Sequence, residues 1–144
     1  MSTLLQVTKE LPATSPDPLV APDYYNVFHM TIGQNKVQYG DRIPALWVNK
    51  AKFFSIGSAV SGNINRVTNF NYNLNQWYHI EILQEENSNG EIIYSVEIDG
   101  FTVDQVVNTL PQIFEKVILY TSDPFYPSFA PFGELRNLNI VNLG

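Results

Sequence analysis

The sequence contains no cysteine, which excludes disulfide bonds, thiol nucleophiles and metal sites with cysteine ligands. It also lacks any run of about 18 apolar residues, the length that a membrane-spanning helix needs. Lysine and arginine number 8 against 14 aspartate and glutamate residues, and the resulting net charge of −6 opposes attraction to phosphate backbones and anionic lipids. We therefore expect neither nucleic acid as a partner nor insertion into a membrane.

Charged residues are scarce, at 15% of the chain, whereas hydrophobic residues make up 44%. This balance excludes an intrinsically disordered chain, in which charge is high and aromatic residues are few. A chain of 144 residues is long enough to bury a stable hydrophobic core without disulfide bonds or structural metal ions. We predict one β-sandwich domain over residues 1–144. The N-terminus lacks the basic and then apolar pattern of a secretory signal.

Short runs rich in valine, isoleucine, phenylalanine and tyrosine recur along the chain, separated by glycine, proline, asparagine and aspartate. Such spacing is typical of an all-β sandwich or barrel. The expected strands are Thr3–Thr8, Asn26–Ile32, Ala45–Val48, Lys52–Val60, Asn63–Phe70, Trp77–Leu83, Glu91–Ile98, Thr102–Asn108, Lys116–Thr121 and Gly133–Val141. Between the first two, prolines crowd residues 11–23, and because proline cannot donate to a strand ladder we expect a surface connector there.

The strongest strand signal lies between Trp77 and Ile98, where apolar and polar residues alternate in two neighbouring runs. A period of two indicates strands with one buried face. The dipeptide Asp99-Gly100 follows, and it favours the two-residue turn of a β-hairpin. Three consecutive strands are therefore expected to be linked by hairpins.

Three segments carry a family resemblance: NQWYHIEI at 75–82, YSVEIDG at 94–100 and GELRNLNI at 133–140. The first two resemble the central hairpin of laminin G-like and pentraxin-like domains, and the third is similar to their last strand. These domains belong to the concanavalin A-like lectin and glucanase superfamily. The resemblance covers about residues 75–140. The disulfide usual near the end of laminin G-like domains has no counterpart in this cysteine-free chain.

The resemblance implies a two-sheet antiparallel jelly-roll sandwich whose terminal strands pair. It places ligands on the concave face or in the loops at the sheet edges. Members bind sugars, other proteins or calcium, and some are glycosidases. We expect an extracellular or cell-surface location. Because the sequence shows no secretory signal, the chain is either an excised domain of a longer protein or, as the alternative, cytosolic.

Catalysis is not expected. Glucanases of this superfamily carry an acidic trio on one strand, and the nearest approach here, Glu97 with Asp99, lacks the third carboxylate. His29 and His79 lie in the middle of predicted strands without the spacing of a metal or serine-hydrolase motif, so we expect both to be outward strand residues.

Calcium is the one cofactor that stays open, because aspartate and asparagine in loops supply the oxygen ligands that this ion prefers. The turn-associated candidates are Asp41, Asp99, Asp104 and Asp123. Aspartate at a turn also caps the backbone, which is the simpler interpretation. We expect no other cofactor.

Sugar binding needs an aromatic face together with amide, carboxylate or guanidinium groups that take hydroxyls. The segment with Tyr39, Asp41 and Arg42 leads into Trp47 and Asn49 and offers this mixture. In it the Asp41-Arg42 pair is a candidate fork for vicinal hydroxyls.

A second candidate segment is the aromatic loop that contains Asp123 and Tyr126. The neighbouring Phe125 and Phe129 are instead expected to fold back over the edge of the core. The alternating asparagines between Asn63 and Asn75 form either a polar ladder for a ligand or an edge strand protected against aggregation, and the second interpretation is favoured.

Together these patterns predict a non-catalytic recognition module that is lectin-like and binds carbohydrate. The first alternative is a protein-interaction or self-associating adhesion domain, which implies a homo-oligomer. The second alternative is a glycoside hydrolase.

Overall fold

The computed structural model describes residues 1–11, 23–121, 125 and 133–141. Within these ranges the chain forms strands and loops and no helix. The strands are β1 (Ser2–Val7), β2 (Tyr24–Thr31), β3 (Ala45–Asn49), β4 (Phe53–Val60), β5 (Asn63–Asn71), β6 (Trp77–Glu86), β7 (Ile92–Ile98), β8 (Phe101–Val107), β9 (Ile118–Tyr120) and β10 (Gly133–Asn139). Each of them overlaps a strand expected from the sequence. No described segment is a helix long and apolar enough to cross a membrane.

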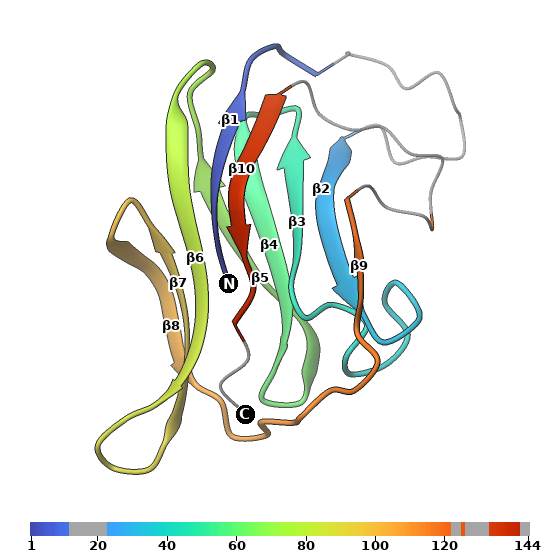
Figure 1. Ribbon diagram of the computed structural model, residues 1–144, viewed down its shortest axis with the longest axis vertical. Coiled ribbons are helices and arrows are strands. Elements are labelled where there is room, and N and C mark those ends of the chain that lie inside the picture. The colour runs from blue at the N-terminus through green and yellow to red at the C-terminus, as the bar shows by residue number, and fades with distance from the viewer. Residues whose placement is uncertain (12–22, 122–124, 126–132, 142–144) are drawn as a thin grey trace.

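The strands form two five-stranded sheets, so the prediction of an all-β, two-sheet antiparallel sandwich is confirmed. The first sheet, named sheet A, has the order β10-β1-β6-β7-β8, and the second, named sheet B, has the order β5-β4-β3-β2-β9. Every pairing in both sheets is antiparallel. Figure 1 shows sheet A extending from β8 on the left to β10 near the centre, and sheet B extending to β9 on the right.

The first and last strands lie side by side in sheet A, as the resemblance implied. Ser2 pairs with Asn139 at one end of the ladder, and Val7 pairs with Gly133 at the other. On its other side β1 pairs with β6, where Leu5 lies opposite Tyr78. The N-terminal strand is therefore held between two neighbours, one of them from the far end of the sequence.

One hydrophobic cluster fills the space between the sheets. The alternation between Trp77 and Ile98 contributes to it as predicted, because Ile80 and Val96 are fully buried and Ile82 is only 7% exposed. From sheet B, Phe54 stacks on Tyr72 with ring centroids 4.7 Å apart. The residues that alternate with these therefore lie on the outer faces of the two sheets.

The turn between β7 and β8 is the Asp99-Gly100 hairpin that the sequence predicts. Both residues have positive φ, at 52° and 81°, which a type I′ turn requires. The Asp99 carboxylate also accepts the backbone N–H of His79 at 2.8 Å. Further along this hairpin the register shifts between Val96 and Glu97, which marks a β-bulge.

Beyond the bulge, Asp104 lies opposite the core residue Val96 and so faces the other sheet. Its carboxylate accepts two hydrogen bonds from the Arg66 guanidinium of β5, at 2.9 and 2.7 Å, and one from the Thr68 hydroxyl at 2.7 Å. The Arg66 hydrogen bond is the main cause that lowers the pKa of Asp104 below its usual value, and burial opposes it. This ion pair joins the edge strands of the two sheets.

Burial raises the pKa of the Tyr94 hydroxyl strongly, and the nearby Asp104 carboxylate adds to the effect. Tyr94 lies on β7, where it is 2% exposed and belongs to the core cluster. Asp104 therefore lies between the buried hydroxyl of Tyr94 and the partly exposed guanidinium of Arg66, at the edge of the sandwich.

Most of the proline-rich connector at 11–23 lies outside the described residues, since only Leu11 and Asp23 belong to them. Leu11 is buried against the core cluster.

Candidate functional site

The outer face of sheet B holds several residues that the sequence analysis selected, and around Trp47 on β3 it is buried. Trp47 and Asn49 alternate with core residues along β3, yet they are only 9% and 6% exposed. On the neighbouring strands Asn26 is 5% exposed and Ser55 is 6% exposed. The Oδ1 atom of Asn49 accepts the backbone N–H of Ala51 at 2.7 Å. This face therefore does not present Trp47 and Asn49 as an open platform for a ligand.

Arg42 packs on the ring of Trp47, with its guanidinium carbon 4.4 Å from the ring centroid. The guanidinium donates hydrogen bonds to the backbone and side-chain oxygens of Asn35, at 3.1 and 3.0 Å, and to Oδ1 of Asn65 at 2.9 Å. A cation held over an aromatic ring and fixed by several acceptors stabilises the local structure. The donors that sugar binding would use already have acceptors within the protein.

Asp41 is fully buried and its carboxylate organises the loop that precedes it. It accepts backbone N–H groups from Gln34 at 3.2 Å, from Val37 at 2.8 Å and from Gln38 at 2.9 Å. Asp41 and Arg42 are adjacent in sequence, but their side chains have separate sets of partners and do not form one fork. The capping interpretation of this aspartate accounts for every hydrogen bond of its carboxylate that the described residues show.

Tyr39 lies in the same loop, and its hydroxyl donates to the backbone oxygen of Leu110 at 2.9 Å. Its ring packs against Phe114 with centroids 5.9 Å apart. The structure thus joins this loop to the segment after β8.

The second predicted segment is largely outside the described residues, which include neither Asp123 nor Tyr126. Phe125 is described, and its ring centroid lies 5.5 Å from that of His29 and 6.1 Å from that of Tyr120. It folds back onto these two rings, as predicted in part, but it stays 36% exposed and does not pack against the core cluster.

The two histidines differ more than the sequence suggests. His29 faces outward from sheet B yet is fully buried, and its Nε2 atom lies 2.6 Å from the backbone oxygen of Asp41. The prediction of an outward strand residue holds for its direction, but the outward position is not exposed to solvent, because the outer face of sheet B is covered at His29. His79 is partly exposed on sheet A, with Nε2 3.9 Å from a carboxylate oxygen of Glu81.

The calcium candidates that the structure describes have protein partners of their own. Asp41 binds backbone N–H groups, Asp99 binds the N–H of His79, and Asp104 binds Arg66 and Thr68. In the described part of the chain no three histidine, aspartate or glutamate side chains form a group that could hold a metal ion. The remaining candidate, Asp123, lies outside that part.

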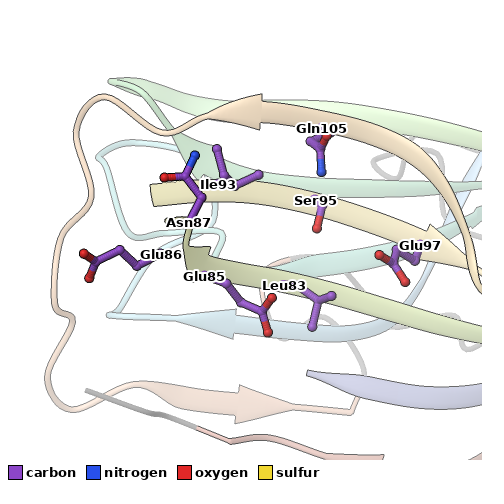
Figure 2. A pocket seen from close by; sticks show the side chains of 8 residues that line it. All are labelled: Leu83, Glu85, Glu86, Asn87, Ile93, Ser95, Glu97 and Gln105. Atoms are coloured by element: carbon purple, nitrogen blue, oxygen red, sulfur yellow. The ribbon is translucent and has the colours of Figure 1, made fainter. Parts of the chain in front are cut away.

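An accessible polar surface lies on the outer face of sheet A, over β6, β7 and β8. There the side chains of Leu83, Ser95 and Gln105 form one row across three strands, because Ser95 pairs with Leu83 on one side and with Gln105 on the other. Figure 2 shows this row with Glu85 and Glu97 to either side of it. Together with Glu86, Asn87 and Ile93 these side chains line a shallow hollow of about 220 Å³, which we name the sheet A hollow.

Ser95 forms the floor of the sheet A hollow and is only 6% exposed. Its hydroxyl makes no hydrogen bond in the described part of the structure, and neither does the side-chain amide of Gln105. The oxygen of this hydroxyl is not among the fully buried side-chain atoms without a hydrogen-bond partner, so it opens onto the hollow, where water or a ligand can bond to it. This feature distinguishes the sheet A hollow from the outer face of sheet B.

The rim of the hollow is acidic. Glu97 lies on β7, half-buried, two residues from Ser95, whereas Glu85 and Glu86 are exposed at the end of β6. Asn87 is occupied by the loop after β6, since its side chain accepts the backbone N–H groups of Asn89 and Glu91. The hydrogen-bonding groups open to a ligand are therefore the hydroxyl, the amide and the carboxylates.

Sequence reasoning considered Glu97 only as a catalytic candidate and missed Ser95 and Gln105. The alternation along β7 places Ser95 and Glu97 on the outer face, and that signal was readable from the sequence. The row that joins Ser95 to Gln105 depends on the bulge in the β7–β8 pairing, which the sequence does not mark.

Comparison of the chain with protein-family models, with curated proteins and with solved structures finds no match. The resemblance to concanavalin A-like domains therefore stays a prediction, and any function rests on the geometry of the chain itself.

Proposed function

We propose that the protein is a non-catalytic recognition module that binds carbohydrate, in the manner of a lectin, in the sheet A hollow. The observation that carries the proposal is the hydroxyl of Ser95, which makes no hydrogen bond within the described part of the protein and opens onto the floor of an accessible hollow. A ligand that hydrogen-bonds to this hydroxyl takes the place of the water that otherwise reaches it.

The lining of the hollow suits a sugar. Hydroxyl, amide and carboxylate groups supply both donors and acceptors for sugar hydroxyls, and Leu83 and Ile93 supply apolar contact for the C–H groups of a ring. The volume of about 220 Å³ is smaller than the roughly 300–1,000 Å³ of pockets for drug-sized ligands. It favours one ring of a saccharide over a larger compact ligand.

The strand scaffold also favours binding over chemistry. The side chains of the hollow project from three hydrogen-bonded strands, which hold them in fixed positions before a ligand arrives. A rigid, open surface with several hydrogen-bonding groups is typical of a recognition site.

Glycan-array screening followed by isothermal titration tests the proposal. We expect Gln105→Ala and Ser95→Val to weaken the binding of any array hit about fivefold or more, since each removes a hydrogen-bonding group from the hollow. The matched control is Gln112→Ala, which removes the same amide from an exposed position after β8. No array hit, or equal affinity for Gln105→Ala and the control, would contradict the proposal.

A second candidate function, self-association, is favoured by one observation. Four large apolar side chains in the segment 107–118 are exposed: Val107 at 38%, Leu110 at 47%, Ile113 at 84% and Ile118 at 45%. Sedimentation tests it, because a homo-oligomer that Ile113→Ser dissociates would support this candidate. If the protein stays monomeric at high concentration, self-association is contradicted and the recognition module is the remaining candidate.

A further inference from the structure

We propose that the sheet A hollow selects a protonated amine, and therefore prefers an amino sugar with a free ammonium group over its N-acetylated form. This inference rests on the proposed carbohydrate-binding function and names the chemical class of its ligand.

The lining of the hollow is negatively charged. Its lining includes three glutamates, Glu85, Glu86 and Glu97, and no lysine, arginine or histidine. None of the three glutamates has an ion-pair partner in the described part of the structure. By contrast, some carboxylates elsewhere are paired with cations, as Glu134 is with Arg136 and Asp23 is with Lys50. The Met1 ammonium group, which donates to the backbone oxygen of Ile82, interacts electrostatically with Glu85, but it forms no ion pair with any glutamate of the hollow. The hollow thus keeps an excess of negative charge.

The carboxylates of Glu97 and Glu85 lie on opposite sides of the row that contains Ser95. Glu97 lies two residues from Ser95 along β7, and Glu85 lies two residues from Leu83 along β6, on the opposite side of the row. Two residues of a strand span about 7 Å. An ammonium group above Ser95 is therefore within reach of the flexible carboxylates on both sides.

The hollow also offers hydrogen-bond acceptors that suit an ammonium group. An ammonium group has three N–H donors and no acceptor, so it needs an environment of acceptors only. The hydroxyl oxygen of Ser95, the amide oxygen of Gln105 and a carboxylate of Glu97 offer three, and the first two have no hydrogen-bond donor among the described residues. An N-acetylated amine keeps one N–H donor, loses the charge and adds a bulky carbonyl group. It satisfies fewer of these acceptors and leaves the carboxylates without a counter-charge.

A metal ion would be a different way to neutralise the rim. The described residues contain no group of three acidic or histidine side chains that could hold one, because the rim carboxylates are spread around the hollow. Direct contact between carboxylate and ammonium is the simpler arrangement.

The test compares chitosan and chitin oligosaccharides of equal length by isothermal titration, since the two differ only in N-acetylation. We expect the chitosan oligosaccharide to bind at least tenfold more tightly in low salt, and the preference to shrink as ionic strength rises. Glu97→Gln and Glu85→Gln should each reduce chitosan affinity about two- to fivefold, the range of exposed ion pairs. The control Glu115→Gln makes the same charge change at an exposed position outside the hollow and should leave affinity unchanged.

The outcomes separate this inference from the proposed function. Equal affinity for the two oligosaccharides, or a loss that Glu115→Gln reproduces, would overturn the amine preference and leave carbohydrate binding in place. Array hits confined to neutral sugars would do the same. No saccharide binding at all would overturn both. Two further arms use calcium and tri-lysine: chitosan binding that requires calcium would overturn direct ammonium contact, and tighter binding of tri-lysine would assign the site to protein amines rather than to sugars.

Discussion

Among the described ion pairs, the one between Arg66 and Asp104 should cost the most folding stability when it is removed. Asp104 is 15% exposed and Arg66 is 34% exposed, so both are partly withdrawn from water. The carboxylate accepts three short hydrogen bonds, two from the guanidinium and one from Thr68. Hydrogen bonds to charged groups contribute about 1.5–3 kcal/mol each when a partner is deleted, but water reaches the exposed side of Arg66 and replaces part of this.

We therefore expect Asp104→Ala to lower the free energy of unfolding by about 2–3 kcal/mol. For a chain of this size the loss corresponds to a fall in Tm of about 5–10 °C. Urea and thermal unfolding of the single variants and of the Arg66→Ala, Asp104→Ala double variant measure the coupling, which we expect to be about 1–2 kcal/mol. The control is Asp23→Asn at the exposed Lys50 pair, where the side chains are 39% and 51% exposed and the expected loss is below about 0.5 kcal/mol.

The same ion pair has a defined pH dependence. The pKa of Asp104 is lower in the folded chain than its ordinary value of about 3.9, so its contribution is present at neutral pH and is lost as the pH falls through the folded pKa. The difference in stability between the wild type and Asp104→Asn should begin to shrink as the pH falls below about 5, and it should vanish only once the pH lies below the folded pKa of Asp104. A constant difference down to pH 2, or a coupling near zero at pH 7, would refute this account of the edge.

Three further predictions follow from single positions. A β-carbon on Gly133 would overlap the backbone oxygen of Gln6, so Gly133→Ala should cost about 2–3 kcal/mol in thermal unfolding, whereas Gly33→Ala, with open space around it, should have little effect. Asp41→Asn replaces one acceptor oxygen with an N–H donor that faces backbone N–H groups, and it should cost about 1–3 kcal/mol in urea unfolding. The purified protein should release no reducing sugar from β-glucans, and turnover that Glu97→Gln abolishes would instead establish a hydrolase.

The strands could be predicted because their signals are local. Apolar alternation from Trp77 to Ile98 and the positive-φ dipeptide Asp99-Gly100 act within a few residues, and the structure follows both. The pairing of β1 with β10 could be expected only through the resemblance, since no local pattern links residues so far apart in sequence.

The positions of the polar side chains could not be predicted in the same way. A two-residue turn at Asp99-Gly100 with regular pairing would place Asp104 opposite Ser95, on the outer face. The bulge shifts the register, so that Gln105 takes this place and Asp104 faces the core side, opposite Val96. One extra residue thus creates both the row in the hollow and the inter-sheet ion pair, and the sequence contains no clear sign of it.

The partners of Asp41 and Arg42 also could not be predicted from the sequence, where the two residues form a candidate fork for sugar hydroxyls. Adjacent polar residues suggest a common target, but the loop before them contains backbone N–H groups that need acceptors, and Asp41 supplies them. The adjacent Arg42 instead covers Trp47. Whether such a side chain binds the backbone of its own loop or remains available to a ligand depends on the path of the loop, and amino-acid composition does not determine that path.

The pairing of Ser2 with Asn139 has a mechanical consequence. The two strands run antiparallel, so tension applied at the two ends of the chain meets at one end of the β1–β10 ladder. Such a load opens hydrogen bonds one after another, like a zipper, instead of shearing the whole ladder at once. The domain should yield at low force when pulled by its ends, with β10 peeling away while β6, β7 and β8 still hold together.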